Sequence, residues 1–412
     1  MTFFSYKDNS VRYGVVVDVG SGSVLASIIE SDQSKTYPTV IWSRREYTPL
    51  RQIDSLNRTV KSIMTSLISV LMTLDSEGRR SLRAVNEKAK ISSLQFTIAA
   101  PWSYTVTKTI SYNNEKEFSV DDDFLSELLK MAEKKVHKEL RENEKIHKLG
   151  LTLISRITAD VVANGYSIEV NEKKKQKANS LKVIELDAIT QTGIVTEIKE
   201  IQSKMFPGTK LQQYSFMMAF FYTILDLYAE TTECCLVDVT YEATEIGIVR
   251  DGVLRYCTNI PHGLATLARE ISVILSVPLE EALGYFKDGN FDNILTKYSE
   301  RQRLDILAVF KAYEDGLVEL FHETGDSLSI PKRIFLHSDL SVAPFFKQKI
   351  TDSANNATKS SHVVYNVTGD LFTKHYSEGE RALITSKKQD TAMLISAQFF
   401  HTQNYARQFE QL

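Results

Sequence analysis

The sequence is poor in cysteine, in net charge and in long hydrophobic runs, and each shortage excludes a class of protein. Cys234 and Cys235 are neighbours and Cys257 stands alone, which matches neither a disulfide framework nor a metal-binding spacing. The eight histidines form no zinc-binding pattern either. With a formal net charge of −3 over 412 residues, no overall basic field would attract nucleic acid. We therefore expect a protein of a reducing cytosol without a nucleic-acid partner.

Two apolar stretches come nearest to a membrane span, and neither meets the requirements of one. Residues 62–74 are too few for the roughly 20 residues that a spanning helix needs. Residues 211–228 are more numerous, but they include Gln212, Gln213 and Asp226 and lack a basic flank. We expect a buried core helix at 211–228. No signal peptide is expected, because the first residues lack a basic region followed by an apolar one.

Two stretches far apart in the sequence share one layout. Residues 13–30 read YGVVVDVGSGSVLASIIE and residues 234–257 read CCLVDVTYEATEIGIVRDGVLRYC. Each consists of a buried strand with an aspartate near its end, a turn and a second strand; the aspartates are Asp18 and Asp238. A chain of this length exceeds one usual domain. The repeat predicts a duplicated fold in which two hairpin turns face a central cleft.

The first turn has the chemistry of a phosphate site. An aspartate at the end of a buried strand can hold a hydrated divalent metal ion. The turn that follows consists of Gly20, Ser21, Gly22 and Ser23, and such residues let backbone N–H groups approach phosphate oxygens closely. The alternative interpretation is a tight hairpin turn without a ligand.

The second turn has lost its glycines. Thr240, Tyr241 and Glu242 stand in their place. A tyrosine would fill the space of a phosphate, and the Glu242 carboxylate would repel it, because two like charges at about 4 Å cost about 4 kcal/mol near a protein surface. Asp238 is either linked to a metal ion or caps the N–H groups of its own turn.

The rest of the chain alternates between strand and helix patterns. We expect strands at 11–19, 24–30, 37–47 and 92–101 and helices at 53–74, 196–205, 279–286 and 300–320. The lysine-rich run at 171–180 is expected to be a solvated hairpin loop, with a lipid or nucleic-acid contact as the alternative. The aromatic end of the chain, with Phe399, Phe400, Tyr405 and Phe409, is expected to dock on the protein rather than to lie on a membrane, since it has a single basic residue.

These hairpins, together with residues 334–346 (IFLHSDLSVAPFF), resemble the actin-like ATPase superfamily, and most of all its bacterial FtsA and PilM branch. The resemblance covers nearly the whole chain. It implies an α/β fold of two duplicated, ribonuclease H-like lobes around a cleft, with a small inserted α+β subdomain. The domains would be 1–89 for the first part of the first lobe, 90–205 for the insertion, and 206–412 for the second lobe and the return of the chain to the first.

The resemblance also implies which residues would bind ATP and Mg²⁺. The positions that match its motifs are Asp18, Gly20, Ser21, Gly22, Ser23, Asp238, Thr244, Gly263 and Ser341, with Asp18 and Asp238 at the metal. Three glycines of the adenosine motif are replaced by Ser338, Asp339 and Leu340. No lysine follows the first motif, so the cation that neutralises phosphate in some relatives is expected to be missing. These changes predict that nucleotide binding is weak or lost, and they do not favour ATP hydrolysis.

The function implied is that of a cytoplasmic adaptor at the cytoplasmic face of the inner membrane. It would link the tails of inner-membrane proteins to a type IV pilus or cell-division assembly, and its own membrane contact would be indirect. One alternative is an ATP-binding protein that self-associates into filaments at the division site. A second, with less support, is an enzyme of the sugar-kinase or acetate-kinase type.

Overall fold

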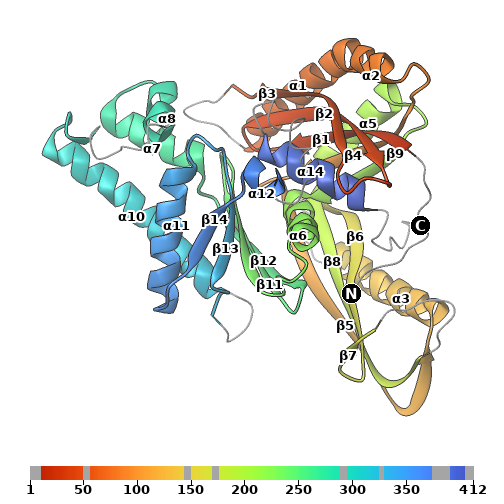
Figure 1. Cartoon of the computed structure of the whole chain (residues 1–412). Helices are drawn as coiled ribbons and strands as arrows, with labels where there is room; N and C mark the ends of the chain where they lie inside the picture. Colours follow the sequence, from red (N-terminus) through yellow and green to blue (C-terminus); the bar gives the residue numbers. More distant parts are fainter. Residues whose placement is uncertain are drawn as a thin grey trace.

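A computed structural model describes residues 11–49, 56–142, 150–168, 176–287, 295–323, 329–373 and 390–403. These residues form three β-sheets. Two of them form lobes that lie side by side, and the third projects away from both (Figure 1). None of the described helices is long and apolar enough to cross a membrane.

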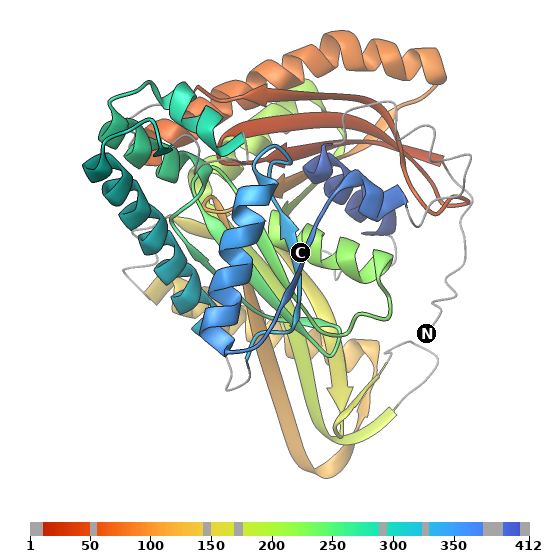
Figure 2. The same ribbon diagram turned by 60° about the vertical axis from the view of Figure 1, so that its left-hand side comes forward.

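The first lobe is built on a five-stranded sheet with the order β3-β2-β1-β4-β9. Its strands are β1 (Val11–Val19), β2 (Ser23–Asp32), β3 (Thr39–Tyr47), β4 (Ile91–Ile98) and β9 (Lys210–Ser215). The first three pair antiparallel, and β4 and β9 continue the sheet in parallel. One face is covered by α1 (Leu56–Thr73), which a π-helical turn (Leu74–Gly78) joins to α2 (Arg79–Val85). The other face is covered by α6 (Phe216–Leu227) and α14 (Thr391–Thr402), as Figure 2 shows.

The second lobe repeats this sheet, in the order β12-β11-β10-β13-β14. Its strands are β10 (Cys234–Val239), β11 (Thr244–Arg250), β12 (Val253–Ile260), β13 (Arg333–His337) and β14 (Val363–Asn366). An antiparallel meander is again followed by two parallel strands. Its helices are α7 (Leu264–Leu275), α8 (Leu279–Lys287), α10 (Glu300–His322) and α11 (Ala343–Thr358), with the short α12 (Gly369–Thr373) leading back towards α14. The repeat inferred from two hairpins therefore extends to whole sheets.

The third sheet forms the projecting part of the molecule. Its order is β5-β8-β6-β7, with β5 (Ser103–Val120), β8 (Gln176–Gln191), β6 (Leu151–Ala163) and β7 (Tyr166–Ser167). Helix α3 (Asp122–Glu142) packs on it, and α5 (Thr192–Met205) leads back to the first lobe. The division of the chain at 90 and 205 stays a prediction; β4 falls inside that range but pairs with β1 of the first sheet.

Two expected elements differ from those observed. The stretch 211–228 is not one helix, because its first residues belong to β9, where parallel pairing with β4 satisfies their backbone groups. Helix α6 begins only at Phe216, after the Ser215 hydroxyl accepts a hydrogen bond from the Met218 N–H at 3.2 Å. In the expected loop at 171–180, residues 176–180 instead extend β8 along β5, while 171–175 lie outside the described residues.

Helix α14, the last described helix, docks on the first lobe. Phe399 and Phe400 are buried there, and the Phe400 ring lies against Gly14 of β1. The guanidinium of Arg12 stacks on that ring, with its carbon 4.7 Å from the ring centroid. Tyr405 and Phe409, expected in the same helix, lie outside the described residues.

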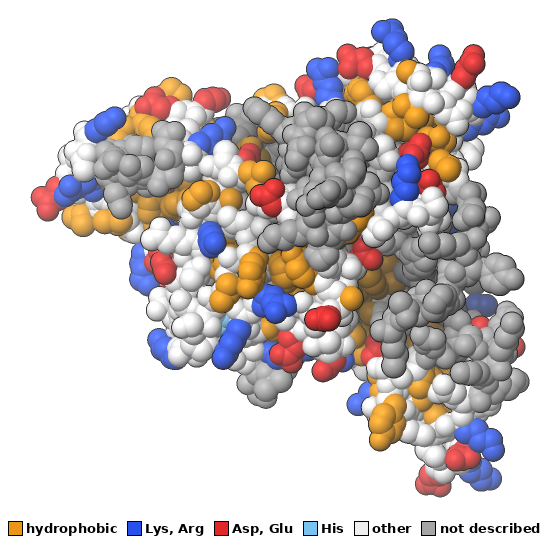
Figure 3. All heavy atoms as spheres, in the orientation of Figure 1, with side chains coloured by type: hydrophobic (Ala, Val, Ile, Leu, Met, Phe, Trp, Pro, Cys, Tyr) orange, Lys and Arg blue, Asp and Glu red, His pale blue; other side chains and the backbone are white. Residues whose placement is uncertain are grey.

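On the face seen in Figure 3, acidic and basic side chains of the described residues are interspersed.

Candidate functional site

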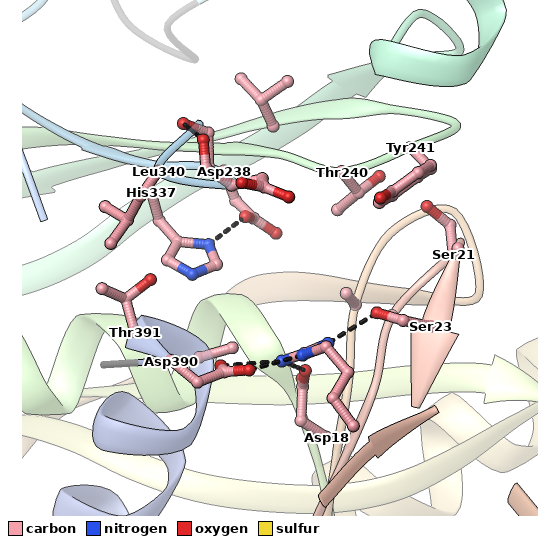
Figure 4. A pocket seen from close by; sticks show the side chains of 18 of the residues that line it. Asp18, Ser21, Ser23, Asp238, Thr240, Tyr241, His337, Leu340, Asp390 and Thr391 are labelled. Carbon is pink, nitrogen blue, oxygen red and sulfur yellow. Dashed lines mark hydrogen bonds and ion pairs between the residues drawn. The ribbon is translucent and has the colours of Figure 1, made fainter. Parts of the chain in front are cut away.

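A hollow of about 550 Å³ lies between the lobes, where the two hairpin turns meet. The loop after β13 and the start of α14 complete its walls (Figure 4). Its lining residues are Asp18, Gly20, Ser21, Gly22, Ser23, Arg45, Tyr47, Ala99, Phe216, Asp238, Val239, Thr240, Tyr241, Lys287, His337, Ser338, Asp339, Leu340, Ser341, Asp390, Thr391 and Ala392. The duplicated fold thus brings together most of the motif residues predicted from the sequence.

A cation that the sequence motifs did not indicate, Arg45, lies beside the first turn. Arg45 of β3 donates to Asp390 through Nε at 2.5 Å and through Nη2 at 2.8 Å. Its Nη1 donates to the Ser23 hydroxyl at 2.6 Å, and its Nη2 lies 3.4 Å from Asp18 Oδ2. No lysine follows the first motif, as the sequence shows, but a cation reaches the turn from another strand. Arg45 comes from the next strand, where antiparallel pairing sets it opposite Leu25.

The pKa values of the two carboxylates beside Arg45 are shifted in opposite directions. Burial raises the pKa of Asp18 to about 6, while the Arg45 charge lowers it. Burial also acts to raise the pKa of Asp390, but the charge and hydrogen bonds of Arg45 outweigh burial and hold it below its usual 3.8. Arg45 also lies closer to Asp390, at 2.5 and 2.8 Å, than to Asp18, at 3.4 Å. Arg45 therefore pairs mainly with Asp390.

The second turn lies directly on the first. The Tyr241 ring covers Gly22 so closely that a Cβ added there would come within 2.3 Å of the ring. The Glu242 N–H donates to the Ser21 hydroxyl at 3.0 Å. The Glu242 carboxylate faces away from the hollow and accepts from Arg269 of α7 at 2.8 Å. The tyrosine thus fills space as expected, but the expected repulsion by Glu242 is not supported, because its charge is neutralised outside the hollow.

Asp238 pairs with a histidine that the sequence reasoning missed. Its Oδ1 lies 2.7 Å from His337 Nδ1, so it is not the cap of its own turn. The imidazole packs against Phe216, with ring centroids 4.9 Å apart. The other carboxylate oxygen, Oδ2, is buried and has no hydrogen-bond partner among the described residues. In the sequence, the signal for His337 was its position just before the expected adenosine loop. In the structure, the parallel pairing of β13 with β10 sets His337 beside Asp238.

The remaining motif residues have structural contacts. The Thr244 hydroxyl donates to the His262 carbonyl at 2.7 Å, and Gly263 lies under the backbone of the second turn. Neither residue lines the hollow. Ser341 does, and its hydroxyl donates to Asp339 at 2.7 Å in the loop expected to hold adenosine. The nucleotide-binding roles given to these residues stay predictions.

In this arrangement the site does not fit Mg²⁺ and ATP. The described residues contain no group of three or more side chains arranged for a metal ion. Asp18 faces Arg45, and one oxygen of Asp238 is held by His337. The space over Gly22, which a phosphate would need, is filled by Tyr241. The metal roles of Asp18 and Asp238 stay predictions that require the two turns to separate.

Replacing Glu245 by glutamine is expected to flatten the pH dependence of stability. Glu245 of β11 is 2% exposed and lies opposite Asp238 of β10. Burial raises the pKa of Glu245 well above 4.5, and the negative charge of Asp238 raises it further. The folded state therefore keeps a proton that the unfolded chain releases, so stability falls as pH rises above 4.5. The substitution should remove a slope of up to about 1.4 kcal/mol per pH unit. Urea unfolding between about pH 5 and 8 measures it.

The control for this measurement is Glu87→Gln, which removes an exposed carboxylate. It is expected to leave the slope as in the unmodified protein. Equal slopes for the Glu245 and Glu87 variants would contradict the prediction.

Sequence comparisons find nothing, whereas structural comparisons find many likenesses. No protein-family model and no curated protein matches the chain. A structure of a PilM-PilN type IV pilus biogenesis complex superposes with a TM-score of 0.53 and 12% identity, over 93% of this chain and 97% of the other. Ethanolamine utilization protein EutJ from Carboxydothermus hydrogenoformans gives a TM-score of 0.40 and 10% identity, over 85% and 84%.

A Bacteroides thetaiotaomicron protein described as having an actin-like ATPase fold gives a TM-score of 0.36 and 9% identity, over 94% of this chain and all of the other. Identities this low bear on the fold alone. The duplicated sheets, each with the same strand order, agree with the likeness to the PilM-PilN structure. The chain has an α/β fold of two duplicated, actin-like lobes.

Proposed function

We propose that the protein is a cytoplasmic scaffold of the PilM kind, which binds the tail of an inner-membrane protein in a type IV pilus or cell-division assembly. The single observation that carries the scaffold part is the direct contact of the two hairpin turns. Tyr241 stands over Gly22, and the Glu242 N–H bonds to Ser21, where a nucleotide's phosphates would separate the turns. The likeness to a complex of PilM with a second protein supports a protein as the ligand.

The contact between the turns also joins the lobes. The Thr240 hydroxyl donates to the Ala100 carbonyl of the first lobe at 3.2 Å, beside the contacts of Tyr241 and Glu242. These contacts set the outer surfaces of the two lobes in a fixed relation that a partner can recognise. A scaffold requires such a fixed surface, whereas an ATPase requires a cleft that opens for its nucleotide.

Mg²⁺-ATP is expected to bind the unmodified protein with a dissociation constant no lower than about 1 mM. Replacing Tyr241 by glycine should lower that constant by at least about tenfold, because it clears the space above Gly22. Isothermal titration measures both values. Tyr256→Gly, at another partly buried tyrosine of the same lobe, is the control and should leave affinity unchanged. Micromolar binding with turnover by the unmodified protein would overturn the scaffold proposal and favour the ATPase alternative.

The partner is tested by affinity capture from the native cells, with the membrane fraction solubilised and the bound proteins identified by mass spectrometry. Recovery of a pilus or division membrane protein, followed by binding of its synthetic cytoplasmic tail to the purified scaffold, is the expected result. Sedimentation of the protein alone as filaments with ATP, without such a partner, would instead support the self-associating alternative.

A further inference from the structure

A buried histidine in the last turn of α14 joins that helix to the first lobe. His401 is 3% exposed, and its ring lies between the Ser31 hydroxyl, 3.0 Å from Nδ1, and the Lys35 carbonyl, 3.1 Å from Nε2. We propose that this contact is a proton-sensitive latch: the last turn of α14 docks on the first lobe with a neutral imidazole, and protonation of His401 in mild acid releases that turn. Neither His401 nor Ser31 lines the hollow between the lobes, and the latch does not depend on the partner proposed above.

The partners of His401 fix the tautomer of its ring. A carbonyl oxygen can only accept, so Nε2 carries the proton that is donated to Lys35, and Nδ1 of the neutral ring accepts from Ser31. The Ser31 hydroxyl in turn accepts from Arg12 Nε at 3.3 Å and from Gln33 Nε2 at 3.1 Å. Both lone pairs of this hydroxyl are therefore used, and its one proton is donated to Nδ1. A second proton on the ring would set two donors against each other across this hydrogen bond.

The surroundings of the ring also oppose a positive charge. Arg12 donates through Nη2 to the carbonyls of Phe400 at 2.7 Å and of His401 at 3.4 Å. A guanidinium thus occupies the end of the helix dipole, where a charged histidine would otherwise be stabilised. Burial lowers the pKa of His401 from 6.5. The hydrogen bond to the Lys35 carbonyl raises this pKa in part, the charge of Arg12 lowers it, and the smaller effects of the Asp32 and Lys35 charges oppose each other.

The acidic groups on the neighbouring elements are engaged elsewhere. Asp32, at the end of β2, accepts through Oδ1 from the Ser34 N–H at 2.9 Å and from the Ser34 hydroxyl at 2.6 Å. Asp226 of α6 accepts from Gln398 Nε2 at 2.7 Å, about one turn of α14 before His401. Neither carboxylate bonds to the histidine ring, so the charge of a protonated His401 would lack an ion-pair partner in the docked turn.

The release is confined to the last turn because apolar contacts hold the rest of the helix. Met393, Leu394 and Ile395 are buried in the core of the first lobe. In the last turn, the Phe400 ring packs on Gly14 and beneath the Arg12 guanidinium. These contacts depend on the same short segment as His401, so we expect them to open together with the latch.

Hydrogen exchange between pH 7.5 and 5.0 tests the latch on the unmodified protein, with rates corrected for the intrinsic pH dependence of amide exchange. Protection at 399–402 should fall below about pH 6.5 by up to about tenfold per pH unit, because the opened turn binds a proton that the docked turn excludes. Protection of α6 and of residues 391–396 should fall less, which distinguishes the latch from acid unfolding of the whole lobe. Protection at 399–402 that is independent of pH, or that falls in step with α6, would overturn the proposal.

The matched variants are His401→Gln and His322→Gln. A glutamine amide offers an acceptor to Ser31 and a donor to Lys35 but takes up no proton, so His401→Gln should abolish the extra loss of protection at 399–402. His322 is an exposed histidine in the last turn of α10, and its replacement should leave that loss unchanged. A loss retained by His401→Gln would refute the latch.

A direct titration keeps the proposal testable if the glutamine variant does not fold. The proton NMR signal of the His401 ring in the unmodified protein, assigned by its proximity to Ser31, should titrate with a midpoint below 6.5. A midpoint at or above 6.5 would show that the docked turn accepts the charged ring, and would overturn the latch.

Discussion

Replacing Arg45 by methionine is expected to lower the free energy of unfolding by about 3–5 kcal/mol. The side chain of Arg45 is 18% exposed, and that of Asp18 is 5% exposed. Methionine keeps most of the apolar packing but leaves Asp18 and Asp390 facing each other without a cation, in a place where water cannot fully solvate them. Urea denaturation at neutral pH measures the loss.

The control for this prediction is the neighbouring residue on the same strand. Arg44 has a side chain that is 48% exposed, and its ion pairs with Glu46 and Glu77 are 4.0 and 3.8 Å long. Because exposed pairs contribute little, Arg44→Met should change stability by no more than about 0.5 kcal/mol. Adding Asp18→Asn and Asp390→Asn to Arg45→Met should recover much of the loss, since no uncompensated charge remains. A loss below about 1 kcal/mol for Arg45→Met would show that the ion pair does not hold the cleft.

Replacing Gly263 by alanine is expected to lower stability by at least about 3 kcal/mol. An added Cβ would lie 2.4 Å from the Thr240 carbonyl oxygen, 2.7 Å from the Ala243 nitrogen and 2.8 Å from the Tyr241 carbonyl carbon. All three are backbone atoms, so no side chain can rotate to make room. The second turn would have to move away from α7, and the contact of Tyr241 with Gly22 would move with it.

Thermal and urea unfolding test this prediction, with Gly284→Ala as the control. Gly284 lies inside α8 of the same lobe, and a Cβ there would meet nothing within 4 Å. Alanine should therefore be neutral or stabilise by up to about 1 kcal/mol through its helix propensity. Equal effects of the two substitutions would contradict the packing role of Gly263. If Gly263→Ala folds, a weaker Tyr241 contact should also appear as faster amide exchange around Gly22.

The elements of the lobes were largely predictable from the sequence because their signals are local. The runs of valine in β1 and of apolar residues in β10 are typical of strands buried on both faces, and their repeated layout predicted the duplication. The stretch 211–228 was harder, since an apolar run does not distinguish a strand from a helix. Only the free edge of β4 made its first residues a strand. Similarly, 176–180 became strand because β5 continues alongside it.

The candidate site was predictable in part. Asp18, Gly22 and Tyr241 could be found because each lies within one of the repeated hairpins. Arg45, His337 and Asp390 could not, because each acts through a partner in another segment. His337 meets Asp238 from 99 positions away, and its position before the expected adenosine loop indicates this partner only once β13 is known to lie beside β10.

The sequence alone predicted two similar lobes and showed that their hairpin turns differ, with glycines in the first turn and Thr240, Tyr241 and Glu242 in the second. Strand patterns and turn residues are properties of short, contiguous segments, so they can be recognised without knowledge of the fold. What fills the cleft became known from the folded chain: an arginine from β3, an aspartate from the start of α14 and the ring of Tyr241. Charges and space in a cleft depend on which distant segments the sheets and helices bring within about 3–4 Å, the range over which hydrogen bonds and ion pairs act.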